Sequence, residues 1–98
     1  MQDEKEFIFN LLNPQTQNQA FQRLMQDYQK PLYNHVRNIV LNHEDANDVL
    51  QNTFVKIFQN LKNFKGDSKL FTWMYRIATN EALTFLNQKA KKSGISSV

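Results

Sequence analysis

Two histidines and one acidic run come nearest to catalytic or metal-binding chemistry in this 98-residue chain. His35 and His43 lack the HExxH spacing that places two metal ligands and a base on one helix face. The run DAND at residues 45–48 begins like a calcium-binding loop, but Val49 and Leu50 follow where such a loop needs an oxygen ligand and a glycine. The chain has no cysteine, and therefore no thiolate ligand or nucleophile. We therefore expect no metal, no cofactor and no enzymatic activity.

Residues 64–80 combine aromatic rings with positive charges, which is a different kind of chemistry. A protein that holds single-stranded nucleic acid needs flat side chains that replace base stacking, at about 1–3 kcal/mol per base, and cations that follow the phosphates. Asn80 adds an amide that can donate to and accept from a base edge. Gly66 permits a close backbone approach. The rings and cations of this stretch are Phe64, Phe71, Trp73, Tyr75, Lys65, Lys69 and Arg76.

An alternative interpretation of these rings is packing. Phe71 and much of Trp73 fall at core spacing, where an aromatic side chain more often packs than binds a ligand. Tyr75 and Phe64 remain open to either role.

Helices must position these residues, because glycine and proline occur only twice each and apolar residues recur at helical spacing. We predict a compact all-α bundle of four to five helices. Asp45 and Ser68 are plausible N-caps, and Pro31 either starts a new helix or kinks a continuous one. The predicted helices cover about 3–12, 16–29, 31–42, 45–62 and 69–89.

The predicted helix over 45–62 has two distinct faces. Its core face holds Ala46, Leu50, Thr53, Phe54, Ile57 and Leu61. Asp48, Asn52, Val55 and Gln59 point the opposite way. Lys56 and Asn60 lie on one flank beside Val49, so that one ligand could touch both. The core face of the last helix holds Leu70, Phe71, Met74, Ile77, Ala78, Ala82 and Phe85.

Charge is distributed unevenly along the chain. Residues 1–50 carry four basic and seven acidic side chains, whereas residues 51–98 carry eight basic and two acidic ones. A basic half favours polyanionic partners, although a solvated surface with chance clustering explains the same pattern. The apolar runs are too short for a membrane helix or a signal peptide. We expect no membrane contact and a cytoplasmic location.

Two motifs together form a specific combination. Residues 45–56 read DANDVLQNTFVK, and residues 64–80 read FKGDSKLFTWMYRIATN. With the upstream stretch 20–33 and Asn60-Leu61, they resemble the region-2 domain of bacterial extracytoplasmic-function (ECF) sigma factors. The resemblance covers about residues 4–92. We accordingly expect one domain over 1–92 and the start of a linker or a disordered tail over 93–98.

The resemblance implies docking on the coiled-coil clamp helices of the largest RNA polymerase subunit. The polar back of the helix over 45–62 would make this contact. The family usually has glutamate where this chain has Asn52, so the docking face carries one charge less. The implied polymerase-binding residues are Asp48, Gln51, Asn52, Val55 and Gln59.

The resemblance also implies a role in transcription initiation. Family members recognise and melt the promoter minus-ten element and capture a base flipped from the non-template strand. The loop over 64–69 would form the pocket, flanked by residues of both neighbouring helices, while Trp73, Tyr75 and Arg76 would hold the separated strand. The implied DNA-binding residues are Lys56, Asn60, Phe64, Lys65, Gly66, Asp67, Ser68, Lys69, Trp73, Tyr75, Arg76 and Asn80.

Full-length members carry a second, helix-turn-helix domain after a linker, and this chain ends where that linker would begin. Alone, the chain should bind DNA weakly, because the second anchor is missing. The alternative function is a protein-interaction module whose surfaces mainly bind a regulatory partner such as an anti-sigma factor. We expect a monomer whose partners are the polymerase core, promoter DNA and an anti-sigma factor.

Overall fold

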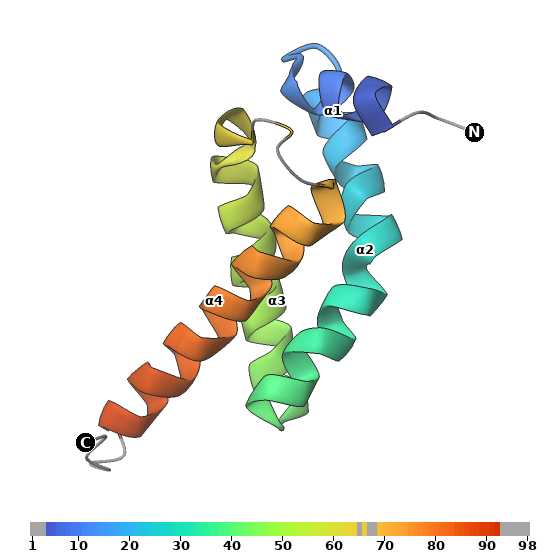
Figure 1. The fold of residues 1–98 in the computed structure, drawn as a ribbon. Coiled ribbons are helices and arrows are strands. Elements are labelled where there is room, and N and C mark those ends of the chain that lie inside the picture. Colours follow the sequence, from blue (N-terminus) through green and yellow to red (C-terminus); the bar gives the residue numbers. More distant parts are fainter. Residues whose placement is uncertain (1–3, 65, 67–68, 93–98) are drawn as a thin grey trace.

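The computed structural model describes residues 4–64, 66 and 69–92, and within them it contains helices and no strand. The prediction of an all-α bundle is confirmed. The helices form three long rods and one short cap (Figure 1). In chain order they are α1 (Glu4–Leu12), α2 (Gln17–Val40), α3 (His43–Gln59), the 3₁₀ turn η1 (Leu61–Asn63) and α4 (Leu70–Lys92).

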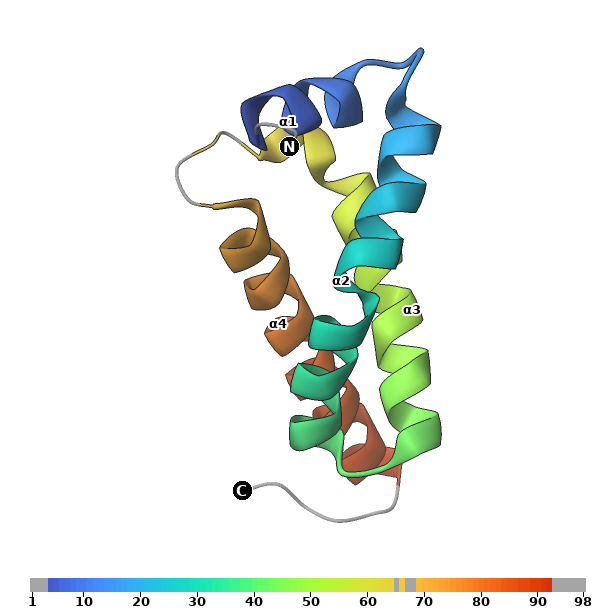
Figure 2. The same ribbon diagram turned by 90° about the vertical axis from the view of Figure 1, so that its right-hand side faces the viewer.

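The three long helices pack against one another, and α1 lies across one end of the bundle. α2 and α3 run antiparallel and are joined at the end remote from α1, as Figures 1 and 2 show. α1 contacts both α2 and η1. α4 begins near α1 and crosses the hairpin of α2 and α3 obliquely (Figure 2). This arrangement brings the end of α3 and η1 beside the first half of α4.

α2 continues through Pro31 as one helix, which decides between the two predicted alternatives. Proline removes one backbone hydrogen bond and crowds the preceding turn. The apolar stripe of α2 is buried on both sides of this position, by Leu24 before it and by Leu32 and Val36 after it. Packing of this stripe therefore keeps the helix continuous across Pro31.

The predicted start of α3 is wrong. The N-cap is Asn42 rather than Asp45, and its side-chain Oδ1 accepts from the backbone N–H groups of Glu44 at 2.9 Å and Asp45 at 3.1 Å. Asn42 has extended backbone angles, which direct its side chain over the first turn. Asp45 instead lies within the helix, where its carboxylate pairs with Lys89 of α4 at 2.7 Å.

The predicted ends of two helices also differ. α3 stops at Gln59 instead of near residue 62, because the backbone tightens into η1. α4 runs to Lys92, past the predicted end at residue 89. The predicted cap Ser68 and the predicted tail over 93–98 lie outside the described residues. The backbone N–H of Leu70, the first residue of α4, donates to Glu4 Oε2 at 3.5 Å.

The core lies where the three long helices meet. All six residues predicted for the core face of the helix over 45–62 are buried, five of them in α3 and Leu61 in η1. Thr53 Oγ1 donates to the carbonyl of Val49 at 2.7 Å. Val49, which the sequence placed on a flank, is also buried because α4 covers that flank. In α4, Leu70, Met74, Ala78 and Ala82 are buried, whereas the other predicted core residues are half-buried.

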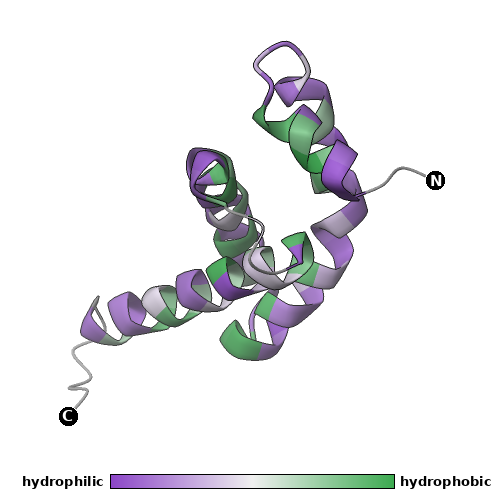
Figure 3. Cartoon of the chain, turned by 45° about the horizontal axis from the view of Figure 1, so that its top comes forward, coloured by the Kyte–Doolittle hydropathy of each residue, from purple (hydrophilic) through white to green (hydrophobic). Residues whose placement is uncertain are grey.

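Hydrophilic and hydrophobic residues share every helix (Figure 3). In the part of the chain that the structure describes, none of the helices is both long and apolar enough for a membrane crossing.

Candidate functional site

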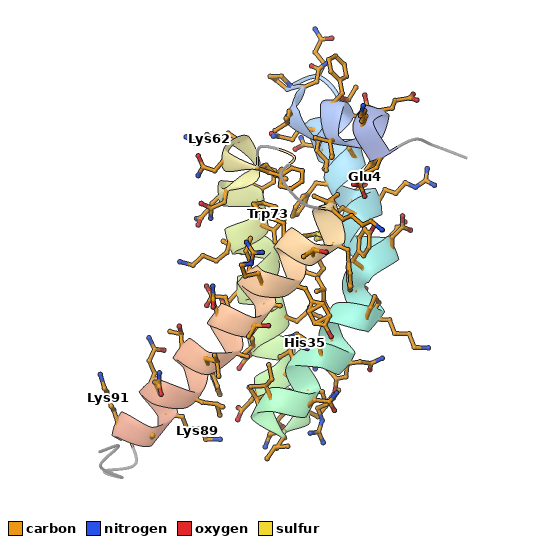
Figure 4. All side chains as sticks on the ribbon, viewed as in Figure 1. Glu4, His35, Lys62, Trp73, Lys89 and Lys91 are labelled. Carbon is orange, nitrogen blue, oxygen red and sulfur yellow. The ribbon has the colours of Figure 1, made fainter. Side chains whose placement is uncertain are left out.

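A hollow of about 430 Å³ lies between the end of α3, η1 and the first half of α4. We call it the pocket. Trp73 projects from α4 on the side that faces α3 (Figure 4). The fold therefore brings together four of the predicted site residues that are distant in sequence: Lys56, Asn60, Trp73 and Asn80. Four further residues complete the lining: Asn63, Ile77, Glu81 and Thr84.

The pocket lining combines amides, one aromatic wall and one ion pair. Asn60 Nδ2 donates to the carbonyl of Lys56 at 2.7 Å, and Asn63 Nδ2 donates to Asn60 Oδ1 at 3.2 Å. Both amides are thereby held where α3 passes into η1. Asn80 is exposed on α4 across the pocket. Since an amide both donates and accepts, this lining suits a planar, neutral group with mixed polar edges.

Phe64 and Trp73 form an aromatic pair at the rim of this pocket. Phe64 is only 8% exposed and belongs to the core, and its ring centroid lies 5.0 Å from that of Trp73. Of the two interpretations of Phe64, the structure favours packing. Trp73 is half-buried, so one part of its indole supports the core while another lines the pocket.

Tyr75 faces away from the pocket, toward α2. Its ring lies 5.1 Å from Phe71 and 3.7 Å from His35, centroid to centroid, in edge-to-face geometry. Phe71 in turn stacks on Tyr28 at 5.3 Å. The sequence grouped Tyr75 with Trp73, but these two residues lie on different sides of α4 because they are only two positions apart in a helix.

His35 of α2 packs against this aromatic cluster through the ring of Tyr75, and its imidazole can titrate. Its Nε2 lies 2.7 Å from Thr79 Oγ1, and Thr79 Oγ1 donates to the carbonyl of Tyr75 at 3.0 Å. Burial lowers the pKa of His35. Burial, with smaller contributions from the carboxylates of Glu4 and Asp27, raises the pKa of the Tyr28 hydroxyl. No sequence pattern predicts that His35 packs against α4.

The remaining predicted DNA-binding residues fall between positions 65 and 76 of the sequence. Lys65, Asp67 and Ser68 are outside the described residues, whereas Lys69 and Arg76 are exposed. Gly66 has φ 76°, in the left-handed region that favours glycine. An added Cβ would meet nothing within 4 Å. Backbone conformation, rather than close packing against another part of the described protein, therefore explains this glycine.

The five residues implied in polymerase docking are all exposed along α3: Asp48, Gln51, Asn52, Val55 and Gln59. Three of them, Asn52, Val55 and Gln59, line a second hollow of about 500 Å³ between α3 and α4, which we call the groove. Phe58 is a further exposed apolar residue of α3, and its ring lies 5.0 Å from that of Phe21. Phe58 is not among the predicted docking residues, although its position three residues after Val55 and off the core face was a usable signal.

Residues 24–92 match the family model of sigma-70 region 2. The chain belongs to this family. More narrowly, it is a region-2 domain of the ECF sigma-factor type. The pocket and the five docking residues all fall within the matched range.

Individual relatives of this region-2 domain are sigma factors. An RNA polymerase sigma-H factor from Pseudomonas aeruginosa is 37% identical over 73 residues, covering 74% of this chain and 38% of the relative. An ECF RNA polymerase sigma-E factor from Haemophilus influenzae is 33% identical over 73 residues, again covering 74% of this chain and 38% of the relative. The sigma-E factor of Escherichia coli K12 is 41% identical over 54 residues, or 55% of this chain and 28% of the relative. The chain thus spans well under half the length of these relatives.

Proposed function

We propose that this region-2 domain acts in transcription initiation: it docks on core RNA polymerase and recognises and melts the promoter minus-ten element by capturing non-template single-stranded DNA. The observation that carries this proposal is the pocket. Lys56, Asn60, Trp73 and Asn80 line one hollow that is large enough to admit a base.

The chemistry of the pocket supports capture of a base. Extruding a base from duplex DNA costs a few kcal/mol. Stacking on an aromatic side chain such as Trp73 returns about 1–3 kcal/mol per base. The amides of Asn60 and Asn80 add donors and acceptors that can distinguish one base edge from another. The exposed cations Lys69 and Arg76 then follow the phosphates of the same strand.

The exposed face of α3 supports docking of a protein partner. It combines Asp48 and three amides with the exposed apolar side chains of Val55 and Phe58. Apolar side chains within a polar rim are typical of a protein interface. The proposed partner is the clamp helix pair of the polymerase, and an anti-sigma factor that covers the same face is the second candidate.

Fluorescence anisotropy of labelled oligonucleotides tests the DNA-binding part. The proposal requires sequence-selective binding of single strands from a minus-ten library, weakened by added salt, with weaker binding of the matching duplex. Equal or tighter binding of the duplex would contradict it. A response of Trp73 fluorescence to an anti-sigma factor but not to DNA would favour the second candidate.

Asp48→Arg tests the docking part. It reverses a charge on the exposed face of α3 and should abolish binding to core polymerase while sparing oligonucleotide binding. Asp27→Arg is the control, since Asp27 is an exposed carboxylate on α2 in an exposed pair with Arg23. Loss of oligonucleotide binding in Asp48→Arg would refute two separate surfaces.

A further inference from the structure

The pocket and the groove share one wall, which consists of Lys56, Glu81 and Thr84. Lys56 comes from α3 and Glu81 from α4, and the ammonium Nζ of Lys56 lies 3.8 Å from Glu81 Oε1. These two are the charged residues in the lining of both hollows. The ion pair therefore stands at the boundary between the proposed DNA pocket and the groove of the docking face.

The two partners of this ion pair differ in how strongly the fold holds them. The Glu81 side chain is 19% exposed, whereas that of Lys56 is 55% exposed. The carboxylate is thus the fixed partner, while the long lysine stem can swing between the carboxylate and a ligand. An exposed ion pair of this kind is weak, so a competing anion can displace it.

The position of Glu81 has a direct consequence for nucleic acid. A phosphate that approaches the pocket meets a carboxylate, which repels it, and a lysine whose charge is already engaged. The amides and the indole, by contrast, are unaffected by the charge of Glu81 and favour a neutral base.

We infer that Glu81 is a positioning residue that restrains Lys56 and thereby lowers the affinity of the pocket for the phosphate backbone of single strands. The inference rests on the proposed DNA-binding function and adds to it a residue that opposes binding of the phosphate backbone. Glu81 makes binding depend on the base in the pocket rather than on charge alone.

A matched control exists elsewhere between the same two helices. Asp45 of α3 and Lys89 of α4 form an ion pair at 2.7 Å, with side chains that are 19% and 56% exposed. Neither residue lines the pocket. Asp45→Asn therefore removes the same charge as Glu81→Gln, from a carboxylate of equal exposure, without touching the pocket.

The test measures the anisotropy of a labelled twelve-nucleotide oligothymidine at several KCl concentrations. Glu81→Gln should bind about two- to fivefold more tightly than Asp45→Asn, which corresponds to release of one exposed ion pair. Its salt dependence should be steeper by about 0.7 in log–log slope, for one further phosphate contact on a single strand. Both gains should disappear in the Lys56→Gln background. Far-UV circular dichroism checks that each variant is folded.

Two results would overturn the inference and leave the proposed function standing. One is equal affinity of Glu81→Gln and Asp45→Asn. The other is a gain that persists in the Lys56→Gln background, because Glu81 would then act by net charge alone. If no variant binds any single strand at low salt, both proposals fail.

Lys56→Gln provides a measurement that does not depend on a Glu81 variant. A restrained Lys56 contributes little in the unaltered chain, so this substitution should weaken oligothymidine binding less than Arg76→Gln does. A larger loss than that of Arg76→Gln would show that Lys56 is already engaged with the strand, and would overturn the inference.

Discussion

The ring of Phe64 packs against the indole of Trp73, with centroids 5.0 Å apart and planes inclined at 47°. Phe64 directly follows η1, and Trp73 lies in the first turn of α4. The pair therefore fastens the two ends of the intervening loop to each other. It also holds the indole in the orientation in which it lines the pocket.

Phe64→Ala should lower the free energy of unfolding by about 3 kcal/mol, because it removes a buried aromatic ring. Urea denaturation followed by circular dichroism measures this change, and Trp73 emission should shift to the red. Phe9→Ala, at an exposed ring on α1, should stay within about 0.5 kcal/mol. Unchanged stability with lost DNA binding would instead make Phe64 a DNA contact.

Asn80→Ala should leave stability within about 0.5 kcal/mol, because Asn80 is exposed. In the proposed function it should reduce discrimination at one base position by about 1–3 kcal/mol, the range for a good base contact. Anisotropy with oligonucleotides substituted one position at a time measures the loss. Asn38→Ala, at an exposed asparagine of α2, is the control. Unfolding of Asn80→Ala would identify a structural residue.

Leu41→Gly should stabilise the protein by about 0.5–1 kcal/mol. Leu41 has φ 65°, a left-handed conformation that costs an L-residue about 1–2 kcal/mol and that glycine adopts freely. Its side chain is 75% exposed, so little packing is lost. Thermal denaturation measures the change. Leu83→Gly, at an exposed leucine inside α4, should destabilise by about 1 kcal/mol. Destabilisation by Leu41→Gly would reveal an unrecognised contact of the leucine.

The stability of the domain should fall as the pH drops below about 6.5, the usual pKa of histidine. Burial lowers the pKa of His35, so the unfolded chain takes up this proton before the folded chain does. The loss of stability caused by His35 is absent above pH 6.5 and is complete once the pH is below the pKa of His35 in the folded state. Urea titrations at pH values between about 8 and 5 measure it. His35→Gln should flatten the dependence.

Helical periodicity alone predicted much of this protein. It predicted an all-α bundle, the buried face of α3, and the common flank of Lys56 and Asn60. It also predicted the exposure of Asp48 and Val55 on the opposite face. These properties depend on contacts three or four residues apart, so the order of residues along one helix is enough to determine them.

Only the tertiary structure decided which partner each side chain meets. α2 continues as one helix through Pro31 because its apolar stripe is buried on both sides of that position. Tyr75 packs on His35 rather than beside Trp73, and the ion pair of Glu81 with Lys56 divides the pocket from the groove. Each of these outcomes depends on the crossing of helices far apart in sequence, and local periodicity carries no information about that crossing.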